Sequence, residues 1–348
     1  MFDLSESDAV FKEQGEEEYR KYQEAHLRDP LPRGPAFSFV RRLLSLNDLA
    51  VGTPASPLVE VILLSRNDPD TGLRVMQSMQ HYQLDVTRAV FTQGRTPYEF
   101  IAPLHIALFL SGDAAGVREA VEKGHPAGHV MASEAVDDPA DTGLRIAFDF
   151  DGVLASDESE RVYQAGDITA FHGYEQAQAG THHQPGPLKE FLVRISRIQR
   201  LEEERRRNDA SYQIRLRVSI VTARNAPSHE RAVQTLKSWG VMVNDAVFLG
   251  GVEKGPVLGV LKPHIYFDDQ VGHIQSAARY VRSVHVPYGI SNVVAPASSK
   301  DVSDVASPMS PVKRSALRKT AGKAATKKSP ATKNRSVAAG AKRPSRKG

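Results

Sequence analysis

The stretch Arg145-Ile-Ala-Phe-Asp-Phe-Asp-Gly-Val-Leu154 decides the fold class of this chain. It opens with a mostly apolar run typical of a buried parallel strand, and Gly152 ends the run. Asp149 and Asp151 therefore stand at the carboxyl end of a strand, one residue apart. Two like charges at that spacing repel each other. A cation or a phosphoryl group would relieve this repulsion, but the pair taken alone is equally compatible with an acidic strand end in contact with water.

Three further strand-like runs also deliver polar side chains at their ends. Val218–Arg224 carries Thr222 near its end, and Ala246–Gly251 is followed by Lys254. His264–Asp269 ends in two acids. Ligands of open α/β sheets bind beyond the carboxyl ends of the strands, so the four runs predict one shared site. A carboxylate nucleophile, an acid/base, a cation and metal-holding acids together suit phosphoryl transfer through an aspartyl-phosphate.

Each of these residues alone also has an ordinary structural interpretation. Thr222 suits a strand or a helix cap, and Lys254 suits a solvated turn. Asp268 and Asp269 could cap the following helix. Their order and joint presence favour the catalytic interpretation. Mg²⁺ is the expected metal because every candidate ligand is a hard oxygen and the chain has no cysteine.

The order of these motifs resembles the haloacid-dehalogenase-like phosphohydrolases, whose motifs read Asp-x-Asp, Ser/Thr, Lys and Asp-Asp. Longer strings are similar to the cytosolic type-I 5′-nucleotidase family, and this resemblance covers roughly residues 1 to 290. The strings are Asp151–Glu160, Pro185–Leu192, Val221–Arg224, Lys254–Leu258 and Pro263–Asp269, with Leu64–Asn67, Asp70–Arg74 and Leu108–Ser111 in the first half.

The resemblance implies hydrolysis of nucleoside 5′-monophosphates, with AMP as the typical substrate. Asp149 matches the family's nucleophile, which would attack phosphorus in line. Asp151 matches its general acid/base, which would protonate the leaving ribose oxygen and then deprotonate the water that cleaves the phospho-aspartate. Thr222 would hydrogen-bond a phosphate oxygen, and Lys254 would neutralise charge in the transition state. A related phosphatase acting on a sugar phosphate is the alternative enzyme. A nucleotide-sensing or nucleic-acid-associated protein that uses the basic C-terminal tail is the alternative of a different class.

The resemblance also implies the ligands of the expected Mg²⁺. They would be Asp149, the backbone carbonyl of Asp151, and the pair Asp268 and Asp269, of which the directly ligating member stays open. The expected substrate-binding positions are Thr222, Ala223, Arg224 and Lys254. Candidates for contact with the base are Phe148, Phe171, Tyr174, Asn225 and the loop of Ser65, Arg66 and Asn67.

Residues 59–122 and 218–279 resemble two copies of one strand–helix–strand–helix–strand unit, unless common α/β patterns explain the match. Three pairs of strings correspond: Val59–Asn67 with Val218–Asn225, Thr87–Gly94 with Asn244–Gly251, and His105–Ser111 with His264–Asp269. The first copy lacks the catalytic residues. It is therefore interpreted as a degenerate packing partner, or as part of an effector or substrate pocket at Ser65, Arg66 and Asn67.

The expected fold is a Rossmann-like, haloacid-dehalogenase-type parallel sheet in residues 144–295, preceded by the degenerate α/β half in residues 1–143. Residues 156–217 are too long for a plain crossover and are interpreted as a cap insertion. An amphipathic helix is predicted over Pro187–Arg207. His182 and His183 are interpreted as exposed loop residues. The family generally has another strand before Phe2-Asp3, so the first half is expected to lack an edge strand or the true start to lie upstream.

Composition divides the chain into an acidic body and a basic tail. The net charge is +4, yet residues 299–348 hold 14 Lys and Arg against 2 Asp, which leaves −8 for the rest. Residues 296–348 are predicted to be disordered. They are interpreted either as a segment that binds nonspecific nucleic acid or as a solvated extension without a specific partner. The absence of cysteine, signal peptide and apolar span predicts a cytoplasmic protein without a membrane partner. A nucleotide effector and a homo-oligomer are further candidate partners.

Overall fold

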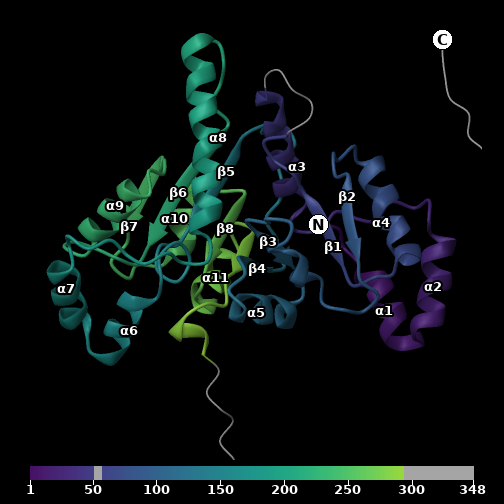
Figure 1. Ribbon diagram of the computed structural model, residues 1–348, viewed down its shortest axis with the longest axis horizontal. Helices are drawn as coiled ribbons and strands as arrows, with labels where there is room; N and C mark the ends of the chain where they lie inside the picture. Colours follow the sequence, from purple (N-terminus) through teal and green to yellow (C-terminus); the bar gives the residue numbers. More distant parts are fainter. Residues whose placement is uncertain (51–56, 294–348) are drawn as a thin grey trace, which may run out of the picture. The chain divides into compact units, whose positions relative to one another are not determined.

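The structure is a computed structural model, and it describes residues 1–50 and 57–293. Its main sheet has seven strands in the order β3-β4-β9-β8-β5-β6-β7, with helices on both sides (Figure 1). The neighbours run parallel, except that β4 and β9 pair antiparallel. The predicted α/β class and mostly parallel sheet are thus confirmed. The strands are β3 (Phe109–Ser111), β4 (Ala127–Val130), β5 (Leu144–Phe148), β6 (Leu216–Thr222), β7 (Asp245–Phe248), β8 (Ile265–Asp268) and β9 (Ser283–His285).

A smaller parallel sheet is formed by β1 (Ile62–Ser65) and β2 (Arg88–Phe91). The α-helices of the described ranges are α1 (Ser5–Gln14), α2 (Glu16–Ala25), α3 (Phe37–Ser45), α4 (Pro69–His81), α5 (Ala114–Glu122), α6 (Glu158–Ala165), α7 (Ile168–Ala177), α8 (Lys189–Asn208), α9 (His229–Ser238), α10 (Lys254–Leu261) and α11 (Val271–Ala277). Short 3-10 helices are η1 (Leu46–Leu49), η2 (Pro97–Phe100) and η3 (Ile290–Asn292).

The strand β5 lies in the interior of the sheet because its sequence is apolar. A strand covered on both faces has no contact with water, so polar side chains on it would be buried at a cost. Phe148 at its end is fully buried and stacks on Phe267 of β8, with ring centroids 5.2 Å apart. Phe191 of α8 packs edge-on against Phe148. The strand end that carries the two acids is therefore held rigidly by aromatic packing.

The predicted helix over Pro187–Arg207 is confirmed as α8. Most of its apolar side is buried, but Leu201 is 37% exposed. One end of α8 extends beyond the sheet (Figure 1). Because α8 packs on β6, it serves as a crossover helix of the sheet. Within residues 156–217, α6 and α7 pack against each other, and the predicted cap role of this segment stays a prediction.

Strands from both predicted halves share the main sheet. Residues Met1–Val294 form one compact unit, and β4 pairs with β9 through His129↔His285 and Val130↔Val284. Strand pairs within and just after the two predicted copies correspond: β1 with β2 matches β6 with β7, and β3 with β4 matches β8 with β9. β4 and β9 follow residues 59–122 and 218–279, respectively. In the second half, β5 lies between β6 and β8 in the sheet. In the described part of the first half, no strand occupies the equivalent place between β1 and β3, which belong to different sheets.

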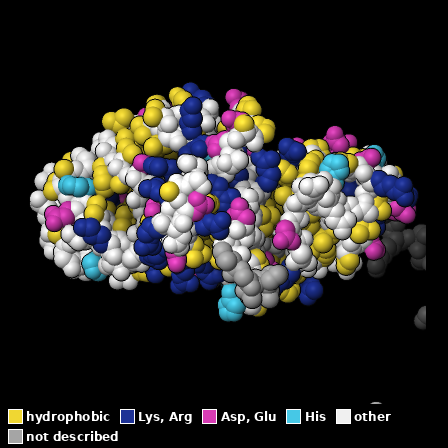
Figure 2. Space-filling view, turned by 90° about the horizontal axis from the view of Figure 1, so that it is seen from above, with side chains coloured by type: hydrophobic (Ala, Val, Ile, Leu, Met, Phe, Trp, Pro, Cys, Tyr) yellow, Lys and Arg dark blue, Asp and Glu magenta, His cyan; other side chains and the backbone are white. Residues whose placement is uncertain are grey.

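The predicted tail, residues 296–348, lies outside the described residues. On the face drawn in Figure 2, basic, acidic and apolar side chains are intermixed rather than separated into single-sign regions. Within residues 1–50 and 57–293, no helix has both the length and the apolar character needed to cross a membrane.

Candidate active site

The candidate site lies where adjacent parallel strands end. Asp149 follows β5 directly, Thr222 is the last residue of β6, and Asp268 is the last residue of β8. Because β8, β5 and β6 are neighbours in the sheet, their carboxyl ends meet at one edge. Lys254 is the first residue of α10, which follows β7. The sheet topology thus gathers groups from four separate stretches of sequence.

Lys254 is the centre of this cluster. Its Nζ lies 3.0 Å from Asp149 Oδ2 and 2.7 Å from Asp268 Oδ2, and the side chain is 1% exposed. Burial alone would lower the pKa of Lys254, but the two carboxylates raise it above its ordinary value. The ammonium is therefore charged at every physiological pH, as a group that stabilises phosphoryl oxygens must be.

One ammonium does not balance the acids around it. Burial raises the pKa of Asp149 to about 6 despite the nearby Lys254, and burial beside Asp149 also raises that of Asp269. Asp268 behaves differently, because Lys254 and His273 hold its pKa below the ordinary value although burial opposes them. Asp269 Oδ1 is buried and has no hydrogen-bond partner among the described residues. Surplus negative charge and a free carboxylate oxygen are what a divalent cation would satisfy.

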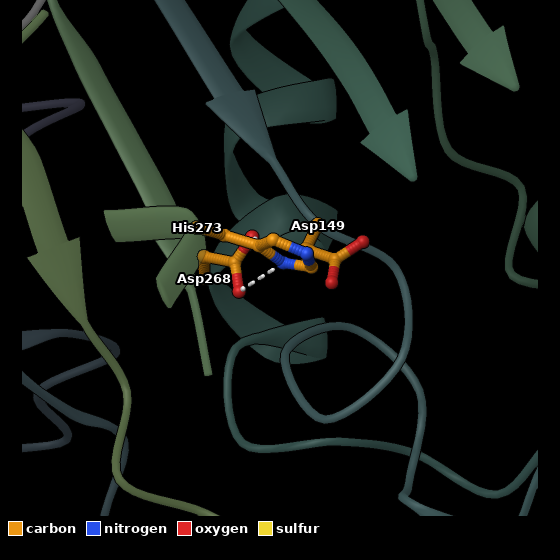
Figure 3. Close-up of side chains that lie close together, drawn as sticks. All are labelled: Asp149, Asp268 and His273. Carbon is orange, nitrogen blue, oxygen red and sulfur yellow. Dashed lines mark hydrogen bonds and ion pairs between the residues drawn. The ribbon is translucent and has the colours of Figure 1, made fainter. Parts of the chain in front are cut away.

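His273 on α11 is a site residue that no sequence motif marked. Asp149, Asp268 and His273 offer ligand atoms within 4.8 Å of one another (Figure 3). However, Asp268 Oδ2 already accepts from Lys254 and Tyr266, and its Oδ1 accepts from the Gln270 N–H at 2.8 Å. His273 Nδ1 also lies 3.2 Å from Asp268 Oδ2, so it serves first as a partner of that acid.

Hydrogen-bond occupancy instead favours Asp269 as the free ligand beside Asp149. Its backbone carbonyl accepts from Asn292 Nδ2 at 2.8 Å, which anchors the loop after β8. Its carboxyl lies against Gly152, where a Cβ would stand 2.5 Å from Asp269 Cγ. Gly152 also has φ +72°, so glycine is required there both for the turn and for the close approach. The unpartnered Asp269 Oδ1 beside these acids fits a hard divalent cation, and a metal held by Asp149, the Asp151 backbone carbonyl and Asp269 stays a prediction.

The carboxylate of Asp151 is bound by Arg224, whereas Lys254 binds Asp149 and Asp268. Arg224 Nε donates to Asp151 Oδ2 and Nη2 to Asp151 Oδ1, each at 2.6 Å. The guanidinium is buried, and the Arg224 N–H donates to Thr222 Oγ1 at 3.3 Å. Ala223 between them is exposed. The predicted contact of Arg224 with substrate stays a prediction, because its side chain is occupied by protein groups here.

Beneath α6 and α7 lies a buried network that continues from Arg224. Arg231 donates to Glu175 Oε1 at 3.0 Å and to Glu158 Oε1 at 2.6 Å. His183 Nδ1 lies 2.8 Å from Glu158 Oε1, and the ring is buried, so the interpretation of His183 as an exposed loop residue was wrong. Although burial would raise the pKa of Glu175, contact with His183 and Arg224 lowers it.

The structure separates the other candidate contacts. Ser65 and Arg66 line a cavity of about 180 Å³ together with Ser111 and Asp113, whereas Asn67 Nδ2 donates to the Tyr19 hydroxyl at 3.1 Å. Two of the aromatic candidates for the base are committed elsewhere. Phe148 is fully buried in the sheet core, and the guanidinium of Arg224 lies 5.4 Å from the Phe171 ring centroid.

The fold and site define an α/β protein with a carboxylate–lysine centre at the carboxyl edge of a mostly parallel sheet. The sequence profile described as 5′-nucleotidase matches residues 1–293, and the chain belongs to this family. The family resemblance of the motifs is thereby confirmed. The human protein named "Cytosolic 5'-nucleotidase 1B" is 33% identical over 293 residues, which are 80% of this chain and 46% of that protein. The chain thus spans about half the length of this relative. No solved structure gives a significant match.

Proposed function

We propose that the protein is a 5′-nucleotidase that hydrolyses AMP-like nucleoside 5′-monophosphates to nucleoside and phosphate. The observation that carries the proposal is the buried Lys254 between Asp149 and Asp268, at the sheet edge where α/β proteins bind ligands. Family membership and the name of the human relative support the nucleotide as substrate class. We infer a haloacid-dehalogenase-like arrangement from the same order of motifs.

In the proposed reaction Asp149 is the nucleophile. Its carboxylate oxygen bonds to phosphorus while the bond from phosphorus to the ribose 5′ oxygen breaks, and Asp151 gives a proton to that oxygen. Asp151 then takes a proton from water, whose oxygen bonds to phosphorus as the bond to Asp149 breaks. Lys254 neutralises charge on the phosphoryl oxygens, and the Thr222 hydroxyl donates a hydrogen bond to one of them.

We propose Mg²⁺ as the cofactor, held by Asp149, the backbone carbonyl of Asp151 and Asp269. The set of hard oxygen donors suits this ion, and the unpartnered Asp269 Oδ1 supplies an open ligand position. When bound, Mg²⁺ would act as a Lewis acid on a phosphate oxygen. Asp268 would instead keep Lys254 in place through its 2.7 Å contact.

Mg²⁺ is expected to raise the melting temperature of the wild-type protein, because binding relieves the repulsion between buried acids. A free concentration of a hundred times Kd corresponds to about 2.7 kcal/mol of stabilisation. The Asp269→Asn variant should lose most of this shift, whereas the exposed Asp138→Asn variant should keep it. Thermal denaturation with a Mg²⁺ titration measures the effect. An equal shift in Asp269→Asn would contradict the assignment of the ligand.

We further propose that α6 and α7 form the cap and that the first half is a degenerate copy of the second. The matching strand neighbours on both sides of the β4–β9 pair support the duplication. The cavity at Ser65 and Arg66 is the candidate place for a nucleotide effector. The relative's name says "cytosolic", and we propose the same location for this protein.

The test of the proposed function is phosphate release from a panel of nucleoside monophosphates and sugar phosphates, with Mg²⁺ and with EDTA. Release from AMP-like substrates that requires Mg²⁺ is the expected result. Release only from sugar phosphates would support the proposed phosphate-ester hydrolysis and would contradict nucleotides as the substrate class. Absence of release from every ester, in a protein shown to be folded, would remove the proposal.

A further inference from the structure

Arg224 makes a two-point contact with the proposed acid/base that leaves Asp151 little freedom. Both carboxylate oxygens of Asp151 accept from the guanidinium at 2.6 Å, the parallel geometry in which arginine and carboxylate fit best. The Arg224 guanidinium carbon also lies 5.2 Å from the ring centroid of Phe150 and 5.4 Å from that of Phe171. The aromatic rings and the two hydrogen bonds together fix the orientation of the carboxylate.

The same guanidinium also binds the proposed cap. Nη2 donates to Ser159 Oγ of α6 at 3.0 Å, and Nη1 donates to Glu175 of α7. Ser159 Oγ in turn donates to Glu175 Oε1 at 2.7 Å, so both helices reach Arg224 through one buried cluster. Ser159, Glu175 and Arg224 are all almost completely buried. Arg224 is therefore the group that joins the cap helices to Asp151.

The buried charge of the Arg224 guanidinium must be balanced by the carboxylates around it. Burial alone would lower the pKa of Arg224, and Asp151 with Glu175 raises it above its ordinary value. The guanidinium therefore keeps its charge and its fork geometry, and a displaced α7 would withdraw Glu175 from it. The orientation of Arg224, and with it that of Asp151, depends on where the cap helices lie.

We infer that Arg224 is a positioning residue, which orients Asp151 for its two proton transfers and makes that orientation depend on the seating of α6 and α7. The inference rests on the proposed function, in which Asp151 serves as acid and then as base. It differs from a phosphate-binding role for Arg224, because the guanidinium acts through Asp151 and the substrate contributes no contact to it.

The leaving group of the substrate distinguishes these roles. Expulsion of ribose requires a proton from Asp151, whereas p-nitrophenolate leaves without one. In Arg224→Ala, kcat for AMP is expected to fall about a hundredfold, the scale of lost acid–base catalysis, with KM little changed. With p-nitrophenyl phosphate the first turnover should stay fast. Stopped-flow measurement should then show a burst of nitrophenolate followed by slow turnover, because the later step still needs Asp151 as base.

Arg224→Lys keeps the charge but cannot form the two-point contact, so it should show the same pattern with smaller losses. Arg231→Lys is the matched control, since Arg231 contacts Glu175 and Glu158 and has no recorded contact with Asp151 in the described chain. It should keep the wild-type ratio of the first-turnover rates on the two esters. Equal losses in the rate of the first turnover on both esters in folded Arg224→Lys, or a raised KM with unchanged kcat, would overturn the inference alone. A wild-type protein that cleaves neither ester would remove the proposed function as well.

Discussion

Replacing Asp149 with asparagine is expected to reduce nucleotide hydrolysis by on the order of 10⁴- to 10⁶-fold, the scale that follows removal of an enzymatic nucleophile. The amide has nearly the shape of the carboxylate, so the loss would reflect chemistry and not packing. Phosphate release from AMP with Mg²⁺ measures it. Incubation with radiolabelled phosphate ester followed by acid quenching should label the wild-type protein and leave Asp149→Asn unlabelled.

Stability measurements separate this loss from unfolding. Because the folded-state pKa of Asp149 is raised to about 6, its stabilising contribution is present below the unfolded pKa and is lost as pH rises through about 6. At neutral pH without metal the charge of Asp149 is therefore unfavourable. Asp149→Asn is expected to unfold at the same or a higher denaturant concentration than wild type. An inactive variant with a large loss of stability would contradict this account, and Asp138→Asn is the surface control.

Replacing Lys254 with methionine is expected to lower both activity and stability. The loss of a charge-stabilising donor corresponds to about a hundred- to a thousandfold in kcat. Removing one partner of a buried ion pair costs about 3–5 kcal/mol, because Asp149 and Asp268 would remain buried without a counter-charge. Turnover and the free energy of unfolding in urea are the two measurements. Lys237→Met, which removes an exposed lysine on α9, should change neither.

A double variant tests whether the ion pair is the cause. Combining Lys254→Met with Asp268→Asn removes one of the two stranded carboxylates and should recover part of the lost stability. Activity should stay low, since no ammonium returns to the site. Additive losses of stability in the double variant would mean that Lys254 stabilises the protein through its packing and that the contacts of 3.0 and 2.7 Å contribute little.

The strand ends of the site could be predicted from the sequence because the signals there are local. Apolar runs followed by Asp149, Thr222, Lys254 and Asp268 mark where strands end, and the rule for parallel sheets brings those ends together. The structure places Asp149, Lys254 and Asp268 in direct contact. The acids of Asp157–Glu160 are likewise a local signal for a helix start, and α6 begins at Glu158.

The supporting contacts could not be predicted, because they join residues distant in sequence. Asp151 and Arg224 are 73 positions apart, and the pattern around Arg224 is compatible with substrate contact as well as with an internal ion pair. The sequence pattern places Glu202 in a run of charged residues, Glu202–Arg207, that is typical of a solvent-exposed helix face. Glu202 is fully buried and accepts from the N–H groups of Arg215 and Leu216, which only the folded loop before β6 brings near.

The pairing of β4 with β9 in the middle of the sheet also could not be predicted from the sequence pattern. The similarity of the two segments indicates that the same unit occurs twice. It does not indicate which strands of the two units pair with each other. Three-residue β9 has too few residues for a recognisable alternation of apolar and polar side chains. The antiparallel contact of His129 with His285 therefore appears only in the folded chain.

The position of β9 has a consequence for the order in which the chain can fold during its synthesis. β9 is the last strand of the described chain to be made, yet it lies between β4 and β8 in the interior of the sheet. Until it emerges from the ribosome, β4 and β8 present open edges to other chains. Within the described chain, the sheet that holds the site is completed only when β9 has been made, so pairing of β4 and β8 with other strands is open until then.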